Sequence, residues 1–322
     1  MDLHGTTNTA QFRVNYTFSS KMFVPKPNLK QLQTYQDAVK HLTIFLQEHA
    51  PKVAILTGAG ISTASGIPCY RGELGSYSKG HKPVDHSEFI SSSSKRARFW
   101  ARSLRGYKYF ASREPTLTHN VLQQLEADSL ISGIITQNVD RLHHKAGSIN
   151  VCELHGRGDT VGCVNKECNH SEIRVEYTKK MEKMNAHWMG EYNLVIEDAT
   201  EPKDIRADGD AHLTLSNYED FQVPSCPKCN DILMPQLTFF GGSIDVSIKD
   251  EAAKIIDDSD ALLILGSSCS VYSAYRLVRA ASTEGKPIMM INIGETRVDD
   301  IVDIKLEYVV DDLFKDLKEN LR

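Results

Sequence analysis

The chain of 322 residues lacks any long apolar run. No stretch approaches the roughly eighteen consecutive apolar residues that a membrane-spanning helix needs, which excludes a transmembrane segment. It also lacks an excess of one charge, since the net charge is −5 and no basic stripe is present. This balance argues against nucleic acid as a direct partner. A composition of 41% hydrophobic and 25% charged residues is typical of a globular protein, and we expect neither a membrane nor a nucleic acid among its partners.

Cysteine is scarce, and a secretory signal is missing. The seven cysteines are an odd number in a long chain. Both features indicate a reducing compartment, in which thiols serve metal binding, catalysis or packing rather than disulfides. No internal repeat is visible, and the length suits one large domain or two modest ones. The sequence leaves the oligomeric state open, and we expect a monomer.

The N-terminal segment differs in composition from the rest. The first thirty residues hold four basic residues against the single acidic residue Asp2, and they are rich in Ser, Thr and Asn. Mitochondrial transit peptides are similarly poor in acidic and rich in hydroxyl side chains, although they usually carry more arginine. We therefore interpret residues 1–27 either as a transit peptide or as a disordered tail.

Short apolar runs alternate with helical patterns along much of the chain. The predicted strands are 53–56, 132–137, 261–268 and 286–294. Helical patterns begin after the potential caps Asn28 and Thr118, cover 250–257 and 272–282, and resume at Asp311. Strands that alternate with helices indicate a parallel sheet covered on both faces. We predict an α/β fold with a Rossmann-like parallel sheet in a catalytic domain over residues 28–322, interrupted twice by segments that form a smaller domain. These segments are a helical insertion at about 73–117 and a cysteine-bearing module at about 157–235.

Four of the cysteines form two local pairs. Cys163 and Cys168 are separated by four residues, and Cys226 and Cys229 by two. Two pairs of thiolates suit a structural Zn²⁺ ion, which takes four soft ligands in a tetrahedron with no open position. The polar segment between the pairs has little else to bury, which disfavours the alternative of four unrelated reduced thiols. We predict one structural zinc ion per chain.

A glycine turn follows the first predicted strand. The sequence Gly58-Ala59-Gly60 opens like a dinucleotide-binding motif, but Thr63 stands where the third glycine belongs, and the acidic residue expected about twenty positions later is missing. Small residues at such a turn let the backbone approach a phosphate. The alternative is a tight connection without a ligand.

Polar residues also stand at or just beyond the carboxyl ends of three other predicted strands. Because the carboxyl ends of parallel strands meet at one edge of a sheet, these residues should converge there. Their hydroxyl, amide and carboxylate groups suit a ligand with ribose and phosphate groups. They are Gln137, Asn138, Asp140, Gly266, Ser267, Ser268 and Asn292.

His155 follows one more short apolar run. One histidine among twelve is more often a structural residue than a catalytic one. Its unperturbed pKa near neutrality also suits a general base. Taken alone, the residue leaves both interpretations open.

Together these motifs resemble the sirtuin family. GAGIS, SGIP, TQNVDRLH, ELHG, the two cysteine pairs, FFG, GSS and NIG occur in the family's order over about residues 25–322. Flanking sequences such as RFWARSLRGY, ADGD and YSAYR are most similar to class II, sirtuin-4-like members. Those are mitochondrial NAD-dependent lysine deacylases, to which ADP-ribosyl transfer is also attributed. The resemblance thus implies a location in the mitochondrial matrix.

The resemblance also implies roles for individual residues. The chain would cleave nicotinamide from NAD and transfer the acyl group of a modified lysine to ADP-ribose, with His155 as general base and Asn138 and Asp140 as further catalytic residues. Residues 239–241 would pair with the backbone of an acylated-lysine protein or peptide substrate. The NAD-binding residues implied are Gly58, Ala59, Gly60, Ser62, Tyr70, Arg71, Gln137, Asn138, Asp140, Gly266, Ser267, Ser268, Asn292, Gly294 and Val310.

Several positions depart from the family pattern. Cys69 stands where most sirtuins have an aspartate associated with nicotinamide recognition, and Gly242 replaces an acidic residue that helps to grip the peptide. Cys269 replaces a common leucine, and Tyr77 is not followed by the arginine that selects succinyl groups. These changes leave the acyl preference open. They also leave two alternatives to the deacylase function open, a protein ADP-ribosyltransferase and a slow sensor of NAD or ADP-ribose.

A Rossmann-type dehydrogenase is a third alternative. It would need the ribose-binding acid that the glycine turn lacks, and it would not need the two cysteine pairs. NADH formation rather than nicotinamide release would distinguish it.

Overall fold

The computed structural model describes residues 34–71, 75, 83–192, 205–211, 213 and 217–320. The predicted tail 1–27 and the position of Tyr77 lie outside these residues. Within the described ranges, no helix has both the length and the apolar character that a membrane span requires.

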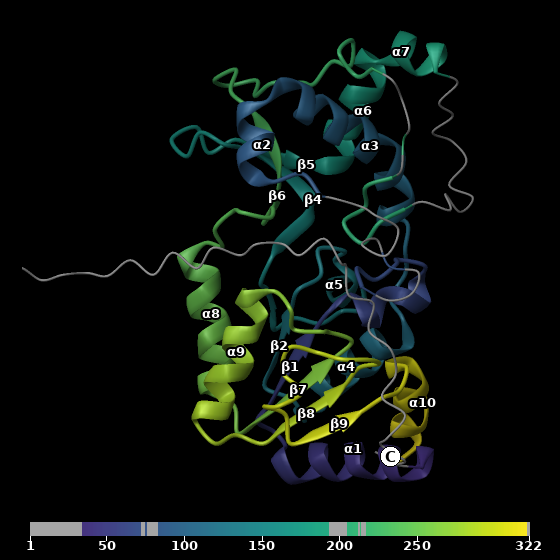
Figure 1. The fold of residues 1–322 in the computed structure, drawn as a ribbon, viewed down its shortest axis with the longest axis vertical. Helices are drawn as coiled ribbons and strands as arrows, with labels where there is room; N and C mark the ends of the chain where they lie inside the picture. Colours follow the sequence, from purple (N-terminus) through teal and green to yellow (C-terminus); the bar gives the residue numbers. More distant parts are fainter. Residues whose placement is uncertain are drawn as a thin grey trace, which may run out of the picture.

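Six parallel strands form the sheet of the larger domain (Figure 1). Their order is β3–β2–β1–β7–β8–β9, and β1 pairs in parallel with both β2 and β7. This is the strand order of a doubly wound Rossmann-type sheet, in which the chain reverses direction across the sheet between the two central strands. The predicted fold class is confirmed. The strands are β1 Val53–Thr57, β2 Gly133–Thr136, β3 Val151–Glu153, β7 Ala261–Leu265, β8 Ile288–Ile291 and β9 Ile304–Leu306.

Helices cover both faces of this sheet. One face packs against α1 (Tyr35–His49), α4 (Leu117–Ala127) and α10 (Val310–Asn320). The other packs against α8 (Val246–Asp257) and α9 (Tyr272–Thr283), on the left in Figure 1. Successive side chains of a strand point to opposite faces, so a strand covered on both sides is apolar at every position. This explains the unbroken apolar runs of β1 and β7.

The caps of two helices can be compared with the prediction. α1 begins at Tyr35, where the side chain of Thr34 accepts a hydrogen bond from the N–H of Asp37 and caps the helix, while the predicted cap Asn28 lies outside the described residues. α4 is capped by Thr116, not by Thr118. The hydroxyl and N–H of Thr118 instead donate to the Asp311 carboxylate, which joins α4 to α10.

The smaller domain lies above the large sheet in Figure 1. Its antiparallel sheet has the order β5–β4–β6. Residues from α3 and from the cysteine-bearing segment share one core, in which Trp100 and Tyr177 pack with ring centroids 4.7 Å apart. The boundaries predicted for the two inserted segments stay predictions. The elements are α2 His86–Ser91, α3 Ser93–Ala111, β4 Gly156–Cys163, β5 Ser171–Ile173, α6 Arg174–Met184, α7 Ala186–Glu191 and β6 Leu233–Leu237.

Candidate active site and metal centre

A cavity of about 870 Å³ is lined by residues of both domains. Its volume falls in the range of roughly 300–1,000 Å³ that is usual for cofactor and small-molecule sites. Of the residues predicted for NAD binding or catalysis, three, Ser62, Asp140 and Gly294, are not part of its lining. The predicted residues that line it are Gly58, Ala59, Gly60, Tyr70, Arg71, Gln137, Asn138, His155, Gly266, Ser267, Ser268, Asn292 and Val310.

The two glycine turns at this cavity pack against each other. Gly58 N–H donates to the carbonyl of Leu265 (3.0 Å), and Gly60 N–H donates to the carbonyl of Gly266 (2.9 Å). A Cβ on Gly60 would lie 2.7 Å from the Cα of Gly266, so neither turn has room for a side chain there. The structural reason for these glycines is therefore the contact between two backbones. Thr63, at the position of the missing third glycine, lies in the 3₁₀ helix η1 (Ala59–Ser65). Because a 3₁₀ helix has negative φ angles, this position does not require glycine.

Polar groups at the ends of neighbouring strands also meet. Gln137 follows β2, and its Nε2 donates to the hydroxyl of Ser267 beyond β7 (2.7 Å). The same hydroxyl accepts from the backbone N–H of Cys269 (3.1 Å), a residue in the left-handed region with φ +49°. Gly294 lies behind the lining, where its N–H donates to Oε1 of Glu307 (3.0 Å). The strand ends thus converge as the parallel sheet predicts.

Ser62 and Asp140 support Asn138 from behind the cavity. Nδ2 of Asn138 donates to the carbonyl of Gly58 (3.1 Å) and to Oγ of Ser62 (3.2 Å). The Ser62 hydroxyl donates to Oδ2 of Asp140 (2.7 Å), and the N–H of Leu142 donates to Oδ1 (2.9 Å). Burial raises the pKa of Asp140, while the hydrogen bonds from Leu142 and Ser62 act in the opposite direction. Asp140 therefore supports the lining residue Asn138 through Ser62 and does not line the cavity itself.

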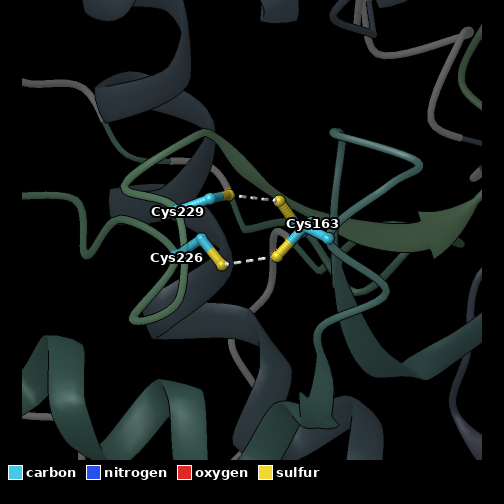
Figure 2. A group of neighbouring side chains, drawn as sticks. Cys163, Cys226 and Cys229 are labelled. Carbon is cyan, nitrogen blue, oxygen red and sulfur yellow. Dashed lines mark hydrogen bonds between the residues drawn. The ribbon is translucent and has the colours of Figure 1, made fainter.

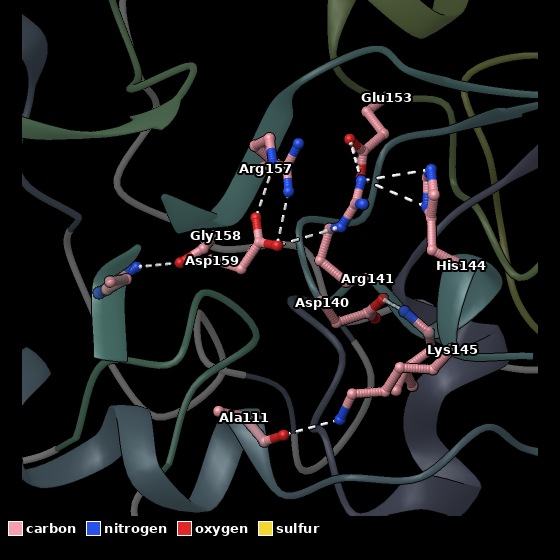
Figure 3. A network of polar contacts seen from close by, with 11 residues as sticks. Ala111, Asp140, Arg141, His144, Lys145, Glu153, Arg157, Gly158 and Asp159 are labelled. Atoms are coloured by element: carbon pink, nitrogen blue, oxygen red, sulfur yellow. Dashed lines mark hydrogen bonds and ion pairs between the residues drawn. The ribbon is translucent and has the colours of Figure 1, made fainter. Parts of the chain in front are cut away.

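A network of ion pairs fixes the same segment from outside, as Figure 3 shows. Arg141, in the left-handed region with φ +65°, pairs with Glu153 at the end of β3 and with Asp159 in β4 (Nε to Oδ2, 3.4 Å). Arg157 contacts the same Asp159 carboxylate (2.6 Å). These pairs are partly exposed, so each stabilises the fold only modestly. They nevertheless connect the segment after β2 to the strands on either side of His155.

His155 lies between β3 of the large sheet and β4 of the small one, and both of its ring nitrogens have partners. Nδ1 lies 3.1 Å from the carbonyl oxygen of Gln137, and Nε2 lies 2.8 Å from Oγ of Ser273. A carbonyl can only accept, so Nδ1 carries the proton and Nε2 of the neutral ring is the acceptor. Burial lowers the pKa of His155, and the hydrogen bond to Gln137 opposes this in part. A neutral imidazole with an acceptor nitrogen is what a general base requires.

Residues 239–241 were predicted to pair with a substrate backbone, but some backbone groups in and next to this segment already form hydrogen bonds within the chain. Phe239 and Phe240 line the cavity. The carbonyl of Phe240 accepts from the N–H of His86 (2.8 Å), and the N–H of Thr238 donates to the carbonyl of His155 (2.8 Å). A peptide can therefore pair only with the remaining backbone groups of this segment.

Sequence reasoning missed several residues at the cavity. Ser273 was not predicted, although it contacts His155. Asp208 and Asp210, from the ADGD sequence, also line the cavity, and burial raises the pKa of both. Oδ2 of Asp210 accepts a hydrogen bond from Arg206 (2.8 Å) and forms an ion pair with Nη2 of Arg102 (2.9 Å). The partners of these residues are distant in sequence or lie on irregular loops, so no spacing rule indicated them.

The four predicted zinc ligands form one cluster in the smaller domain. Figure 2 shows the sulfur atoms of Cys163, Cys226 and Cys229 turned toward a common centre. All four sulfurs lie within 4.8 Å of one another, with Cys163 to Cys229 at 3.4 Å and Cys168 to Cys226 at 3.6 Å. Zn–S bonds of about 2.3 Å in a tetrahedron place sulfurs about 3.8 Å apart, so the cluster fits zinc. None of these cysteines lines the cavity, which agrees with a structural role.

Comparison with known proteins relates this geometry to a family. The model of the Sir2 family matches residues 58–273. The chain belongs to the Sir2 family. This sirtuin is 42% identical over 273 residues to NAD-dependent protein deacylase Sirt4 of Drosophila melanogaster, over 84% of this chain and 83% of that protein. It is 42% identical to NAD-dependent protein deacylase SRT2 of Arabidopsis thaliana, over 83% of this chain and 72% of the relative.

A solved sirtuin structure shares the fold. Sir2 with a p53 peptide and NAD⁺ superimposes with a TM-score of 0.69 at 29% sequence identity, over 88% of this chain and 98% of that chain. The resemblance to sirtuin-4-like members that the motifs predicted is confirmed by the fly relative.

Proposed function

We propose that this sirtuin is an NAD-dependent protein lysine deacylase that cleaves nicotinamide from NAD and transfers the acyl group to ADP-ribose. The observation that carries the proposal is the neutral His155, whose acceptor nitrogen lies at a cavity between the two domains. The relatives in fly and Arabidopsis are named as NAD-dependent protein deacylases, which supports the same reaction.

The residues at the cavity fit a dinucleotide. The large domain contributes hydroxyl and amide groups at the ends of its strands, and Arg71, whose guanidinium lies 3.5 Å from Oγ of Ser268, contributes a positive charge for phosphates. Bound NAD supplies a ribose carbon with nicotinamide as the leaving group. In this proposal His155 accepts and returns a ribose proton at Nε2. Asn138 is held by Ser62, so that its amide contacts the ligand without rearrangement.

The small domain would receive the acylated lysine. Phe99, Leu237 and Phe239 give its side of the cavity an apolar surface that suits an acyl chain and the lysine methylenes. Since Sir2 has been solved with a p53 peptide, a peptide substrate is the natural expectation for this chain. The zinc ion would support this domain and take no part in the reaction.

The test is a panel of acyl-lysine peptides, with neutral and acidic acyl groups, incubated with NAD and analysed by mass spectrometry. We expect nicotinamide, deacylated peptide and O-acyl-ADP-ribose in equal amounts for at least one acyl group. ADP-ribosylated peptide without deacylation would instead favour the transferase alternative. Tight binding of ADP-ribose without product in a single turnover would favour the sensor, and NADH formation would favour a dehydrogenase.

We further propose the mitochondrial matrix as the location, on the composition of residues 1–27 and the resemblance to sirtuin-4-like proteins. A fluorescent reporter fused after residue 27 should then enter mitochondria, and a diffuse reporter would contradict this. The monomeric state also stays a prediction, which light scattering can check.

A further inference from the structure

Ser273 lies in the first turn of α9, the twelve-residue helix that follows β7. Serine at a helix start often caps the backbone, but here the N-cap residue is Val271, and the cap involves no side chain. The hydroxyl of Ser273 is bonded to Nε2 of His155, at 2.8 Å, across 118 residues of sequence. Both residues line the cavity. The serine therefore serves the histidine and not its own helix.

Three separate parts of the chain hold the imidazole. The ring extends from the turn between β3 and β4, Gln137 at the end of β2 accepts from Nδ1, and Ser273 at the start of α9 contacts Nε2. With both nitrogens bonded, rotation of the ring is restricted, and only one neutral tautomer satisfies the Gln137 carbonyl. The positive end of the α9 dipole also disfavours an added proton at the ring.

We propose that Ser273 is a positioning residue for His155. Its hydroxyl keeps the lone pair of Nε2 directed at the cavity before the ligand binds, in the neutral tautomer protonated at Nδ1. An incoming hydroxyl can then take the place of the serine hydroxyl at Nε2 without a turn of the ring. The effect of Ser273 on turnover rests on the proposed deacylase function. The tautomer and orientation of the His155 ring in the free protein do not depend on that function.

The ring can be observed directly in protein labelled with ¹⁵N-histidine, with the His155 signal assigned by its loss in His155→Ala. In the parent we expect a protonated Nδ1 and a hydrogen-bonded acceptor Nε2. Ser273→Ala should move the Nε2 resonance toward that of a nitrogen without a protein donor, and Ser273→Thr, which keeps the hydroxyl, should restore it. Ser282→Ala lies on the exposed last turn of the same helix and should change nothing.

Kinetics with the preferred acyl-peptide then test the consequence. Ser273→Ala should lower kcat on the order of tenfold or more, because a misplaced base is inefficient, with KM for NAD within a few-fold of the parent. Ser273→Thr should recover most of the rate. An unchanged Nε2 resonance in Ser273→Ala, or equal losses of kcat in the Ala and Thr variants, would overturn the proposal. If the parent turned over no peptide, the deacylase function would fail, while the resonances would still decide the role of Ser273 in the free protein.

Discussion

The two domains are stabilised in different ways. In the large domain a parallel sheet lies between two apolar layers, and strands such as β1 and β7 are buried along their whole length. The small domain has a three-stranded sheet, an aromatic core around Trp100, and a cluster of four cysteines. The single apolar cluster of the small domain is smaller than the two layers of the large one, and a metal ion bound by the four cysteines adds to its stability.

The two domains also contribute different kinds of residues to the cavity. The large domain places glycine turns, amides and hydroxyls at its strand ends, while the small domain contributes apolar side chains and the acidic residues Asp208 and Asp210. His155 stands between β3 and β4, where the chain passes from one domain to the other. The proposed base therefore depends on both domains, and perturbing each one separately should have distinguishable effects.

The largest effect should come from the zinc cluster. Folding of isolated zinc modules gains about 10–16 kcal/mol from the metal, so chelation or Cys229→Ser should unfold much of the small domain. We expect about one zinc per chain, and fast hydrogen exchange in β4 and β6 after its removal, while β1 and β7 stay protected. Cys69→Ser, outside the cluster, is the control. A metal-free protein, or a Cys229→Ser variant with full protection, would contradict the zinc site.

His155→Ala should abolish turnover while both domains stay folded. A general base contributes about 10²–10⁴ in rate, and His155 is one lining residue among many, with its ring bonded to Gln137 and Ser273. We therefore expect NAD affinity within a few-fold of the parent, measured by calorimetry. His187→Ala, an exposed histidine on α7, should leave both quantities unchanged. Loss of NAD binding together with turnover would assign His155 to ligand binding instead.

Leu263→Ala should destabilise the large domain alone. Leu263 is fully buried in the central strand β7, and truncation at such a site costs about 2–5 kcal/mol. Denaturant unfolding should show this decrease in the free energy of unfolding, while the zinc content stays at about one ion per chain. Ile173→Ala, at a residue of β5 that is 62% exposed, should change stability by no more than about 0.5 kcal/mol. Loss of zinc in Leu263→Ala would mean that the two domains unfold as one.

The difference between the domains also limits what the sequence could predict. The strands β1, β2, β7 and β8 follow from apolar runs that end in polar residues, and the cysteine pairs follow from their spacing, whereas the short edge strands β3 and β9 were not predicted. The contact between Ser273 and His155 spans 118 residues and depends on how α9 is placed, so no local pattern encodes it. The prediction of Thr118 as the cap of α4 was wrong for a similar reason, since Thr118 is engaged in a tertiary contact with Asp311 and Thr116 caps the helix instead.

The smallest expected effect concerns Cys69, which lines the cavity where most sirtuins carry an aspartate. A thiol is a weak hydrogen-bonding group, whereas a carboxylate would accept strongly from the carboxamide of nicotinamide. Such a charge-assisted bond contributes about 1.5–3 kcal/mol, or about one to two orders of magnitude in affinity. We therefore expect weak inhibition by nicotinamide and slow exchange of labelled nicotinamide into NAD.

Cys69→Asp should strengthen inhibition by nicotinamide and speed up nicotinamide exchange, each by at least several-fold. Cys69→Asn separates charge from shape, because its neutral amide supplies only the ordinary bond of about 0.5–1.5 kcal/mol, and it should fall between the parent and the Asp variant. The zinc content should not change in either variant, since Cys69 lies outside the metal cluster. A parent that exchanges nicotinamide as fast as Cys69→Asp would show that the carboxamide takes its hydrogen bond elsewhere in the cavity. The large domain would then recognise nicotinamide through groups other than residue 69, and Asn138, held in place by Ser62, would be the next residue to replace.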